Sequence, residues 1–244
     1  MKLAVEKLEA GYQGKTVVKD VSFTVEKGEF ISLIGPSGCG KSTVLKVLAG
    51  LLEPMAGTIM VDDALLQGGS RHFSYMPQSD LLLDWYDILD NVCLYGKIHG
   101  KKKEAQQQAL ENLKEFGLAG YEHAYPSQLS GGMRQRAAFL RTALCDSDIL
   151  LLDEPFGALD VITREDMQDW LNRMRQRLDR TTLLVTHDID EAIYLSDRIL
   201  ILGQRPATIT RIVDVRHPHK DRAWLYAQGE LRAAIHQELS HEVL

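Results

Sequence analysis

The segment Gly-Pro-Ser-Gly-Cys-Gly-Lys-Ser-Thr (GPSGCGKST), residues 35–43, decides the fold of this 244-residue chain. It fits the pattern G-x-x-x-x-G-K-[ST], in which glycines let backbone N–H groups curl around phosphate oxygens at a helix N-terminus. A strand-like run at 30–34 (FISLI) precedes it and a helical run at 41–51 follows it. The sequence therefore predicts a phosphate-binding loop, in which Lys41 reaches the β- and γ-phosphates and Ser42 holds Mg²⁺.

A second motif, ILLLDEP at residues 149–155, has the form of a buried strand that ends in two carboxylates. The carboxyl ends of strands are where open α/β sheets bind ligands. Neighbouring strand residues point in opposite directions, so the two acids can take different roles. We expect Asp153 to hold Mg²⁺ and Glu154 to polarise an attacking water.

A third motif, LSGGMRQR, occupies residues 129–136. Ser130, Gly131 and Gly132 are typical of a helix start with free N–H groups, which can form a second phosphate-sized nest. A plain helix start capped by Ser130 is an equally good interpretation of these residues alone. The presence of the other two motifs favours the phosphate site.

The elements outside the motifs predict a mostly parallel sheet covered by helices on both faces, with a helical block between its two halves. In the helical block, Ala109, Leu110, Leu113 and Phe116 mark one apolar face, and Gly117 is placed as a helix C-terminal glycine. Further strands are expected at 16–25, 57–61, 73–76, 149–152, 182–185 and 199–202, and further helices at 131–144, along 167–178 and as a single helix at 221–239.

Composition excludes several classes of protein. Twenty-eight Lys and Arg against 34 Asp and Glu give a formal charge of −6, which disfavours non-specific nucleic-acid binding. Three widely spaced cysteines without a C-x-x-C pair disfavour a disulfide scaffold or a zinc ribbon and fit a reducing compartment. Charges within the first twelve residues are not typical of a signal peptide, and no apolar run approaches the ~18 residues that span a bilayer.

Taken in order, GPSGCGKS, Gln78, LSGGM, LLLDEP, ALD and His187 resemble the nucleotide-binding subunit of an ABC transporter. The resemblance runs from about Tyr12 to His187. It implies a P-loop NTPase of the α/β class: a RecA-like, mostly parallel sheet core with an antiparallel β subdomain and a helical insertion subdomain. It divides the single domain into a nucleotide-binding core (1–86 and 148–214), a helical subdomain with the LSGG signature (87–147) and a helical tail (215–244).

The resemblance also implies roles for single residues. Tyr12 would stack on adenine, although an ordinary core or turn position is the commoner place for a tyrosine. Gln78 would touch Mg²⁺ or the attacking water, His187 would contact the γ-phosphate, and Asp160 would lie at a subunit interface. The implied ATP-binding residues are Tyr12, Gly35, Pro36, Ser37, Gly38, Cys39, Gly40, Lys41, Ser42, Thr43, Ser130, Gly131 and Gly132. The implied catalytic residues are Lys41, Gln78, Glu154 and His187, with Ser42, Gln78 and Asp153 as Mg²⁺ ligands.

Partners follow from the same resemblance. Two copies would sandwich two ATP molecules head to tail, each LSGG segment covering the nucleotide on the other copy. An integral membrane permease would contact residues 78–92, where Leu81, Leu82, Leu83, Trp85 and Tyr86 form an apolar cluster, and a solute-binding protein would deliver cargo. The subunit would lie on the cytoplasmic face of the membrane as a peripheral protein, without a nucleic-acid partner.

The amino-acid sequences of several segments are similar to those of importers of the nitrate, sulfonate and taurine branch, which also includes systems for thiamin-precursor pyrimidines. A small anion or a pyrimidine-type solute is therefore the expected cargo. The chain departs from the usual family pattern at Met133 and Gly157, and neither change removes a phosphate-contacting group. Asp84 stands where proline is usual in the importer branch. Alternative interpretations are an exporter subunit and a soluble ATPase of iron–sulfur cluster assembly. DNA-repair ATPases and translation factors of the superfamily fit less well, because they carry coiled-coil insertions or two phosphate loops.

Overall fold

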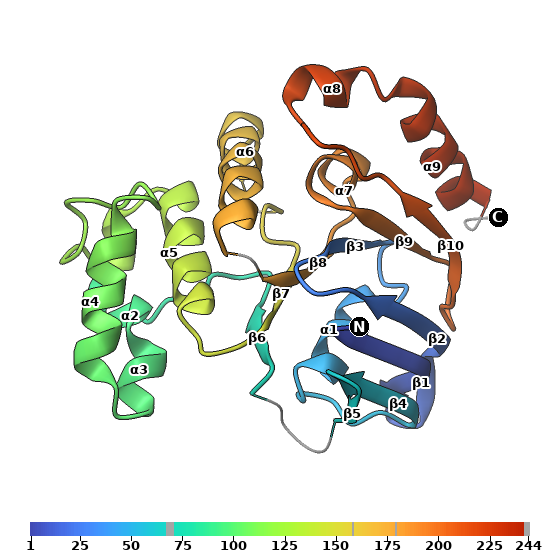
Figure 1. Ribbon diagram of the computed structural model, residues 1–244, viewed down its shortest axis with the longest axis horizontal. Coiled ribbons are helices and arrows are strands. Elements are labelled where there is room, and N and C mark those ends of the chain that lie inside the picture. The colour runs from blue at the N-terminus through green and yellow to red at the C-terminus, as the bar shows by residue number, and fades with distance from the viewer. Residues whose placement is uncertain (67–70, 158, 179, 242–244) are drawn as a thin grey trace.

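The computed structural model describes residues 1–66, 71–157, 159–178 and 180–241, whose strands form two sheets (Figure 1). The larger sheet has the order β10-β9-β3-β8-β7-β6, with β10 antiparallel to β9 and the other neighbours parallel. Its strands are β3 (Phe30–Ile34), β6 (Phe73–Met76), β7 (Ile149–Asp153), β8 (Thr181–Val185), β9 (Arg198–Leu202) and β10 (Ile209–Asp214).

The smaller sheet is antiparallel and has the order β2-β1-β4-β5, so the expected antiparallel subdomain is present. Its strands are β1 (Leu3–Tyr12), β2 (Lys15–Val25), β4 (Ala56–Val61) and β5 (Ala64–Leu65). Sequence analysis assigned no strand to β1, β5 or β10. In β1, register shifts between Val5 and Leu8 and between Leu8 and Ala10 interrupt the two-residue alternation that identifies a strand in a sequence.

The helices lie around the sheets in three groups. Helix α1 (Lys41–Leu48) follows β3, and α6 (Val161–Leu178) and α7 (Ile189–Leu195) follow β7 and β8. In Figure 1 the helical block extends beyond β6, away from the small sheet, and the tail helices lie on the side of β10. The block contains α2 (Ile88–Val92), α3 (Leu94–Ile98), α4 (Lys102–Leu113), the 3-10 turn η1 (Pro126–Gln128) and α5 (Gly131–Ala143). The tail contains α8 (Arg222–Tyr226) and α9 (Gly229–His241).

Two hydrophobic cores lie on opposite faces of the large sheet. In β3, Ile31 and Leu33 belong to the core shared with α1 and the small sheet, whereas Phe30 and Ile34 belong to the core shared with the helical block and α7. Every residue of β3, β7 and β8 is buried, as expected for parallel strands covered on both faces. Among the described residues, no helix combines the length and apolarity needed to span a membrane.

Three helix predictions were wrong in detail. The helix predicted at 41–51 ends at Leu48, because Gly50 has a positive φ and closes the helix with hydrogen bonds back to the last turn. Leu110 is 52% exposed, whereas Ala105, Ala109 and Leu113, spaced four residues apart, form the buried stripe. The tail is two helices instead of one, and it breaks just before Gly229, a residue that costs about 1 kcal/mol in a helix interior relative to alanine.

Candidate functional site

The site is assembled at the carboxyl edge of the large sheet. Val185 of β8 is paired with Leu33 of β3 on one side and with Asp153 of β7 on the other. The chain segments that leave these three strands therefore start side by side. They carry the phosphate loop, Glu154 and His187, so the topology brings together the motifs that the sequence separates by up to about 150 residues.

The phosphate loop has the backbone that its glycines permit. Gly38 and Gly40 have φ values of +72° and +133°, and a Cβ at Gly40 would lie 2.5 Å from a methyl group of Val18. Lys41 is 5% exposed, and its Nζ donates to the carbonyl oxygens of Gly35 at 2.8 Å and Pro36 at 3.0 Å. The ammonium therefore hydrogen-bonds to the loop itself, and phosphate oxygens can replace these two carbonyl oxygens as its partners.

Asp153 faces Ser42 across the loop. The Ser42 Oγ donates to Asp153 Oδ1 at 2.8 Å, and the Tyr75 hydroxyl donates to Asp153 Oδ2 at 2.9 Å. Burial and the Asp153 carboxylate raise the pKa of Tyr75. A hydroxyl and a buried carboxylate side by side are hard oxygen donors, so the set fits Mg²⁺. Tyr75 was not predicted as a site residue, because in the sequence it is one aromatic residue of a short strand.

Glu154 lies between Gln78 and His187. Its Oε2 accepts from Gln78 Nε2 at 3.2 Å and lies 3.3 Å from His187 Nδ1. Glu154 also has a φ of +46°, uncommon for a residue with a side chain, while its N–H donates to Val185 at 2.9 Å. Strain of this kind persists where the surrounding structure imposes it, often at functional sites. Glu154, which is expected to polarise the attacking water, thus contacts both Gln78 and His187, the other two residues expected to act at the terminal phosphate.

Tyr12 lies at the end of β1 and is 44% exposed. It pairs with Lys15 of β2, and Val17 and Val18 of the same hairpin lie beside Gly40, so Tyr12 stands at the end of a hairpin that packs on the phosphate loop. A half-exposed aromatic ring at this place is compatible with stacking on a base.

Ser130 caps helix α5, accepting from the Met133 N–H at 3.3 Å, so the interpretation as a helix cap is correct in the isolated chain. A Cβ at Gly132 would lie 2.5 Å from the Thr163 methyl, and one at Gly131 would lie 3.6 Å from Leu159. Close packing of α5 on the start of α6 thus requires glycine at 132. Among the described residues, no hydrogen bond or ion pair joins Ser130–Gly132 to the phosphate loop of the same chain.

In the segment 78–92, hydrogen bonds from Arg141 fix part of the backbone, while some of the side chains are exposed. Arg141 donates to the carbonyl oxygens of Asp80 at 2.5 Å and Leu81 at 2.7 Å. Leu81 and Trp85 are 59% and 71% exposed, whereas Leu82 is buried. The expected apolar cluster is therefore divided between the core and the surface.

Behind His187, Glu191 of α7 is 4% exposed. Its carboxylate accepts from Thr186 Oγ1 at 2.5 Å and from Gln168 Nε2 at 3.0 Å, and burial raises its pKa to about 7. Thr186 precedes His187, so this buried cluster positions the histidine's backbone. The buried cluster around Glu191 was not predicted, because an acid in the first turn of a helix is ordinarily solvated.

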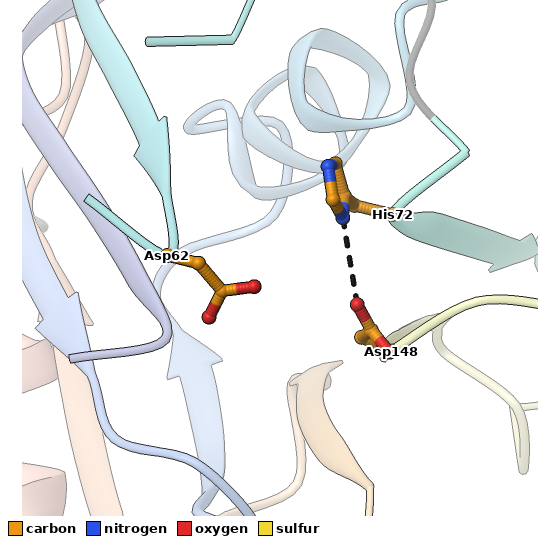
Figure 2. A group of neighbouring side chains, drawn as sticks. All are labelled: Asp62, His72 and Asp148. Carbon is orange, nitrogen blue, oxygen red and sulfur yellow. Dashed lines mark hydrogen bonds and ion pairs between the residues drawn. The ribbon is translucent and has the colours of Figure 1, made fainter. Parts of the chain in front are cut away.

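A second group of potential metal ligands, Asp62, His72 and Asp148, lies where the end of β4 meets the starts of β6 and β7 (Figure 2). The Lys2 Nζ donates to Asp62 at 2.7 Å and to Asp148 at 2.9 Å. Burial lowers the pKa of Lys2, but the hydrogen bonds to the two carboxylates outweigh it and raise the pKa above its ordinary value. The lysine thus supplies the positive charge, and the cluster ties the N-terminus to the start of β7.

Comparisons with known proteins agree with this geometry. The family described as ABC transporter matches residues 18–157. The chain is 50% identical over 208 residues to the aliphatic sulfonates import ATP-binding protein SsuB 1 of Rhodococcus jostii, covering 85% of this chain and 80% of that protein. It is 41% identical over 234 residues to the taurine import ATP-binding protein TauB of Yersinia pestis (96% and 90% covered) and 47% identical over 206 residues to the formylaminopyrimidine import ATP-binding protein ThiZ of Halalkalibacterium halodurans (84% and 80% covered).

Among solved structures, the chain is similar to the dimeric post-hydrolysis state of the ATP-binding cassette MJ0796 bound to ADP and Pi. The TM-score is 0.74 at 28% identity, and the match covers 88% of this chain and 99% of the other.

Proposed function

This chain belongs to the ABC transporter family and is an ATP-hydrolysing subunit, and from that premise we propose that it powers solute import through a membrane permease. One observation carries the catalytic part: the Glu154 carboxylate contacts both Gln78 and His187, beside the phosphate loop and the Ser42–Asp153 pair. The import names of the relatives favour this direction over an exporter or an iron–sulfur assembly ATPase.

We assign the triphosphate to the loop of residues 35–43, with its backbone N–H groups and Lys41 facing the phosphate oxygens and Tyr12 against adenine. Ser42, Asp153 and Gln78 are the residues that would hold Mg²⁺, which when bound neutralises phosphate charge. Support for the ion comes from the Ser42–Asp153 contact, which pairs a hydroxyl with a carboxylate buried to 5% exposure.

We assign Glu154 as the general base that takes a proton from water as it attacks the γ-phosphate. Gln78 and His187, which lie within 3.3 Å of the same carboxylate oxygen, would orient the water and contact the terminal phosphate. Product release would then reopen the site. The protein's part in this reaction is positioning and charge stabilisation, which is sufficient because little covalent chemistry is required of it.

We propose that Ser130, Gly131 and Gly132 complete the site of a second copy. The segment is exposed at Ser130, and within its own chain it makes no hydrogen bond or ion pair to the described phosphate loop. The similar cassette MJ0796 is dimeric with its products bound. In this arrangement the core (residues 1–86 and 148–214) binds nucleotide, and the helical subdomain (residues 87–147) places Ser130–Gly132 over the nucleotide of the other copy. The remaining residues, 215–244, are the tail.

The cargo is proposed from the relatives, whose names specify sulfonates, taurine and formylaminopyrimidine. A small organic anion or a pyrimidine-type solute, delivered by a solute-binding protein, is the class that these names share with the expectation from sequence. The test is uptake by proteoliposomes containing the subunit, its permease and the loaded binding protein. Uptake should require ATP and should be lost in Lys41→Ala; uptake by that variant at the normal rate would refute the proposal.

The permease is proposed to contact the residues 78–92, through the exposed side chains of Leu81 and Trp85. Trp85→Ala should weaken co-purification with the permease and reduce permease-stimulated ATPase, because exposed aromatic residues are frequent interface anchors. Tyr226→Ala removes an aromatic side chain of similar exposure, 64%, on α8 and serves as the matched control. Equal binding and stimulation in the two variants would place the contact elsewhere.

A further inference from the structure

A groove separates the phosphate loop from the C-terminal helix. It has a volume of about 420 Å³ and is lined by residues 35–37, His187 and Ile189 on one side and by His236, Leu239 and Ser240 of α9 on the other. We name it the tail groove. Its lining is mainly apolar, which is unexpected beside a loop that binds phosphate.

Contacts of helix α9 with α7 and with the hydrophobic core fix one wall of the tail groove. Arg232 Nε donates to Asp190 Oδ1 at 2.6 Å, which fixes α9 to the first turn of α7. At the edge of the groove, Leu239 packs against the core that the large sheet shares with the helical block and α7, and Ile235, one turn earlier, is buried. The groove is therefore a preformed surface with an apolar wall next to the nucleotide site.

A complementary apolar surface lies elsewhere on the same chain. Val161 and Ile162 open helix α6 and are 70% and 75% exposed, so two adjacent apolar side chains face solvent in the isolated chain. Asp160 accepts from the Thr163 N–H at 3.1 Å, so it caps the helix and fixes the direction of the pair. We name Val161 and Ile162 the apolar pair.

The apolar pair is rigidly attached to the segment that caps the second copy's nucleotide. A Cβ at Gly131 would lie 3.6 Å from Leu159 and one at Gly132 would lie 2.5 Å from the Thr163 methyl, so the segments 159–163 and 130–132 are packed side by side. A second copy that places Ser130–Gly132 over a phosphate loop therefore carries the apolar pair into the same interface. The apolar surface beside that loop is the tail groove.

We infer that the tail groove receives Val161 and Ile162 of a second copy, so that helix α9 is part of the interface that closes over ATP. The inference rests on the head-to-tail dimer proposed above and adds the tail to it. It explains both apolar surfaces at once, because each covers the other by the two-fold exchange that a symmetric dimer requires.

Cross-linking tests the inference directly. In the full chain with Glu154→Gln to hold the dimer and Cys145→Ser to remove the more accessible native thiol, Ile162→Cys and Ser240→Cys should form an intermolecular disulfide with Mg-ATP and much less of it with ADP. Light scattering in the same samples reports dimer formation independently. A dimer without that disulfide overturns the inference and leaves the proposed function standing, whereas failure of Mg-ATP to form any dimer defeats both.

Charge substitution provides a second test. Ile162→Glu should weaken the Mg-ATP dimer at least tenfold, whereas Ile98→Glu, at an isoleucine of matched 72% exposure on α3, should not. Leu239→Glu should act like Ile162→Glu, with Gln237→Glu as its control on the same helix, and thermal melting verifies that each variant folds. Leu239→Lys should restore dimers of Ile162→Glu. Dimerisation that is insensitive to Leu239→Glu would contradict the inference. So would a tail groove that is shielded from solvent by added permease but not by dimerisation.

Discussion

Glutamate 154 combines two features that rarely occur together. Its backbone has a positive φ, and its carboxylate meets a glutamine and a histidine from two other chain segments. The backbone conformation turns the chain sharply at the end of β7, so that Asp153 and Glu154 face different partners. Asp153 meets Ser42 and Tyr75, and Glu154 meets Gln78 and His187, so the two acids have different surroundings, in line with the proposed roles of Asp153 in metal binding and of Glu154 in water activation.

Glu154→Gln should bind ATP but nearly stop its turnover. The amide keeps the size of the side chain and its contact with His187, but it cannot accept the proton from water, so the rate should fall by about 10²–10⁴-fold. Phosphate release and nucleotide binding, measured on the same preparation, check the two halves of the prediction. Turnover near the normal rate would remove Glu154 from the role of base.

Alanine substitution should have opposite effects at two glycines of the site. Gly40→Ala meets a φ of +133° and a Val18 methyl 2.5 Å away, so it should destabilise the fold by more than about 1 kcal/mol and abolish ATP binding. At Gly157 a Cβ would find ordinary contacts, the nearest being the Glu154 carbonyl oxygen at 3.5 Å. Gly157→Ala should therefore raise the free energy of unfolding by about 0.4–1 kcal/mol. Urea unfolding curves measure both, and a destabilised Gly157→Ala would contradict the prediction.

At the scale of elements, β8 and α7 act as a unit that carries His187. Thr186 and Glu191 are buried beneath the histidine, and Gln168 of α6 completes their hydrogen bonding. Arg164 of α6 lies 3.8 Å from Asp188, which caps α7. The position of His187, which we propose contacts the γ-phosphate, is thus coupled to helix α6, whose first turn carries the apolar pair that we place at the dimer interface.

The buried carboxyl of Glu191 should make stability depend on pH. Its folded-state pKa of about 7 is above its ordinary value of 4.5, so the folded state binds the proton more tightly. Its contribution is fully present below about pH 4.5 and is lost as pH rises through 7. Between pH 6 and pH 8 the free energy of unfolding should fall by about 1 kcal/mol more in the wild type than in Glu191→Gln. Identical pH dependence in both, measured by chemical unfolding, would exclude the effect.

At the scale of the whole molecule, we propose that the nucleotide site of each chain is completed by a second copy. The phosphate loop, the two acids and His187 come together in one chain, whereas Ser130–Gly132 form a capped helix start with no hydrogen bond or ion pair to the described phosphate loop. In the proposed dimer, closure of two copies assembles the site and reopening releases its products.

Mixing two inactive variants should restore activity. Lys41→Ala lacks the phosphate-binding cation, and Ser130→Glu places a negative charge where the cap meets the other copy's phosphates. A mixed dimer has one intact composite site, formed by the loop of the Ser130→Glu copy and the cap of the Lys41→Ala copy. Phosphate release from the mixture should exceed that of either variant alone; a mixture no more active than their average would show that each chain completes its own site.

The local motifs were determined by the sequence alone. The strand, loop and helix around residues 35–43, the acidic strand end and the parallel strands around them were predicted correctly, because glycine conformations, capping and apolar runs are encoded in contiguous residues. Their meeting at one sheet edge could also be predicted, since parallel strands share an edge for their carboxyl ends. The bulged strand β1 could not, because its pairing with β2 and β4 stabilises a segment whose own alternation is broken.

Only the tertiary structure decided which side chains meet. Tyr75 on Asp153, Lys2 between Asp62 and Asp148, and the groove between the phosphate loop and α9 all join residues from distant parts of the chain. No local pattern marks such pairs, because each partner alone has an ordinary environment in the sequence. Their energies depend on burial and distance, which exist only once the sheets, the helical block and the tail have packed together.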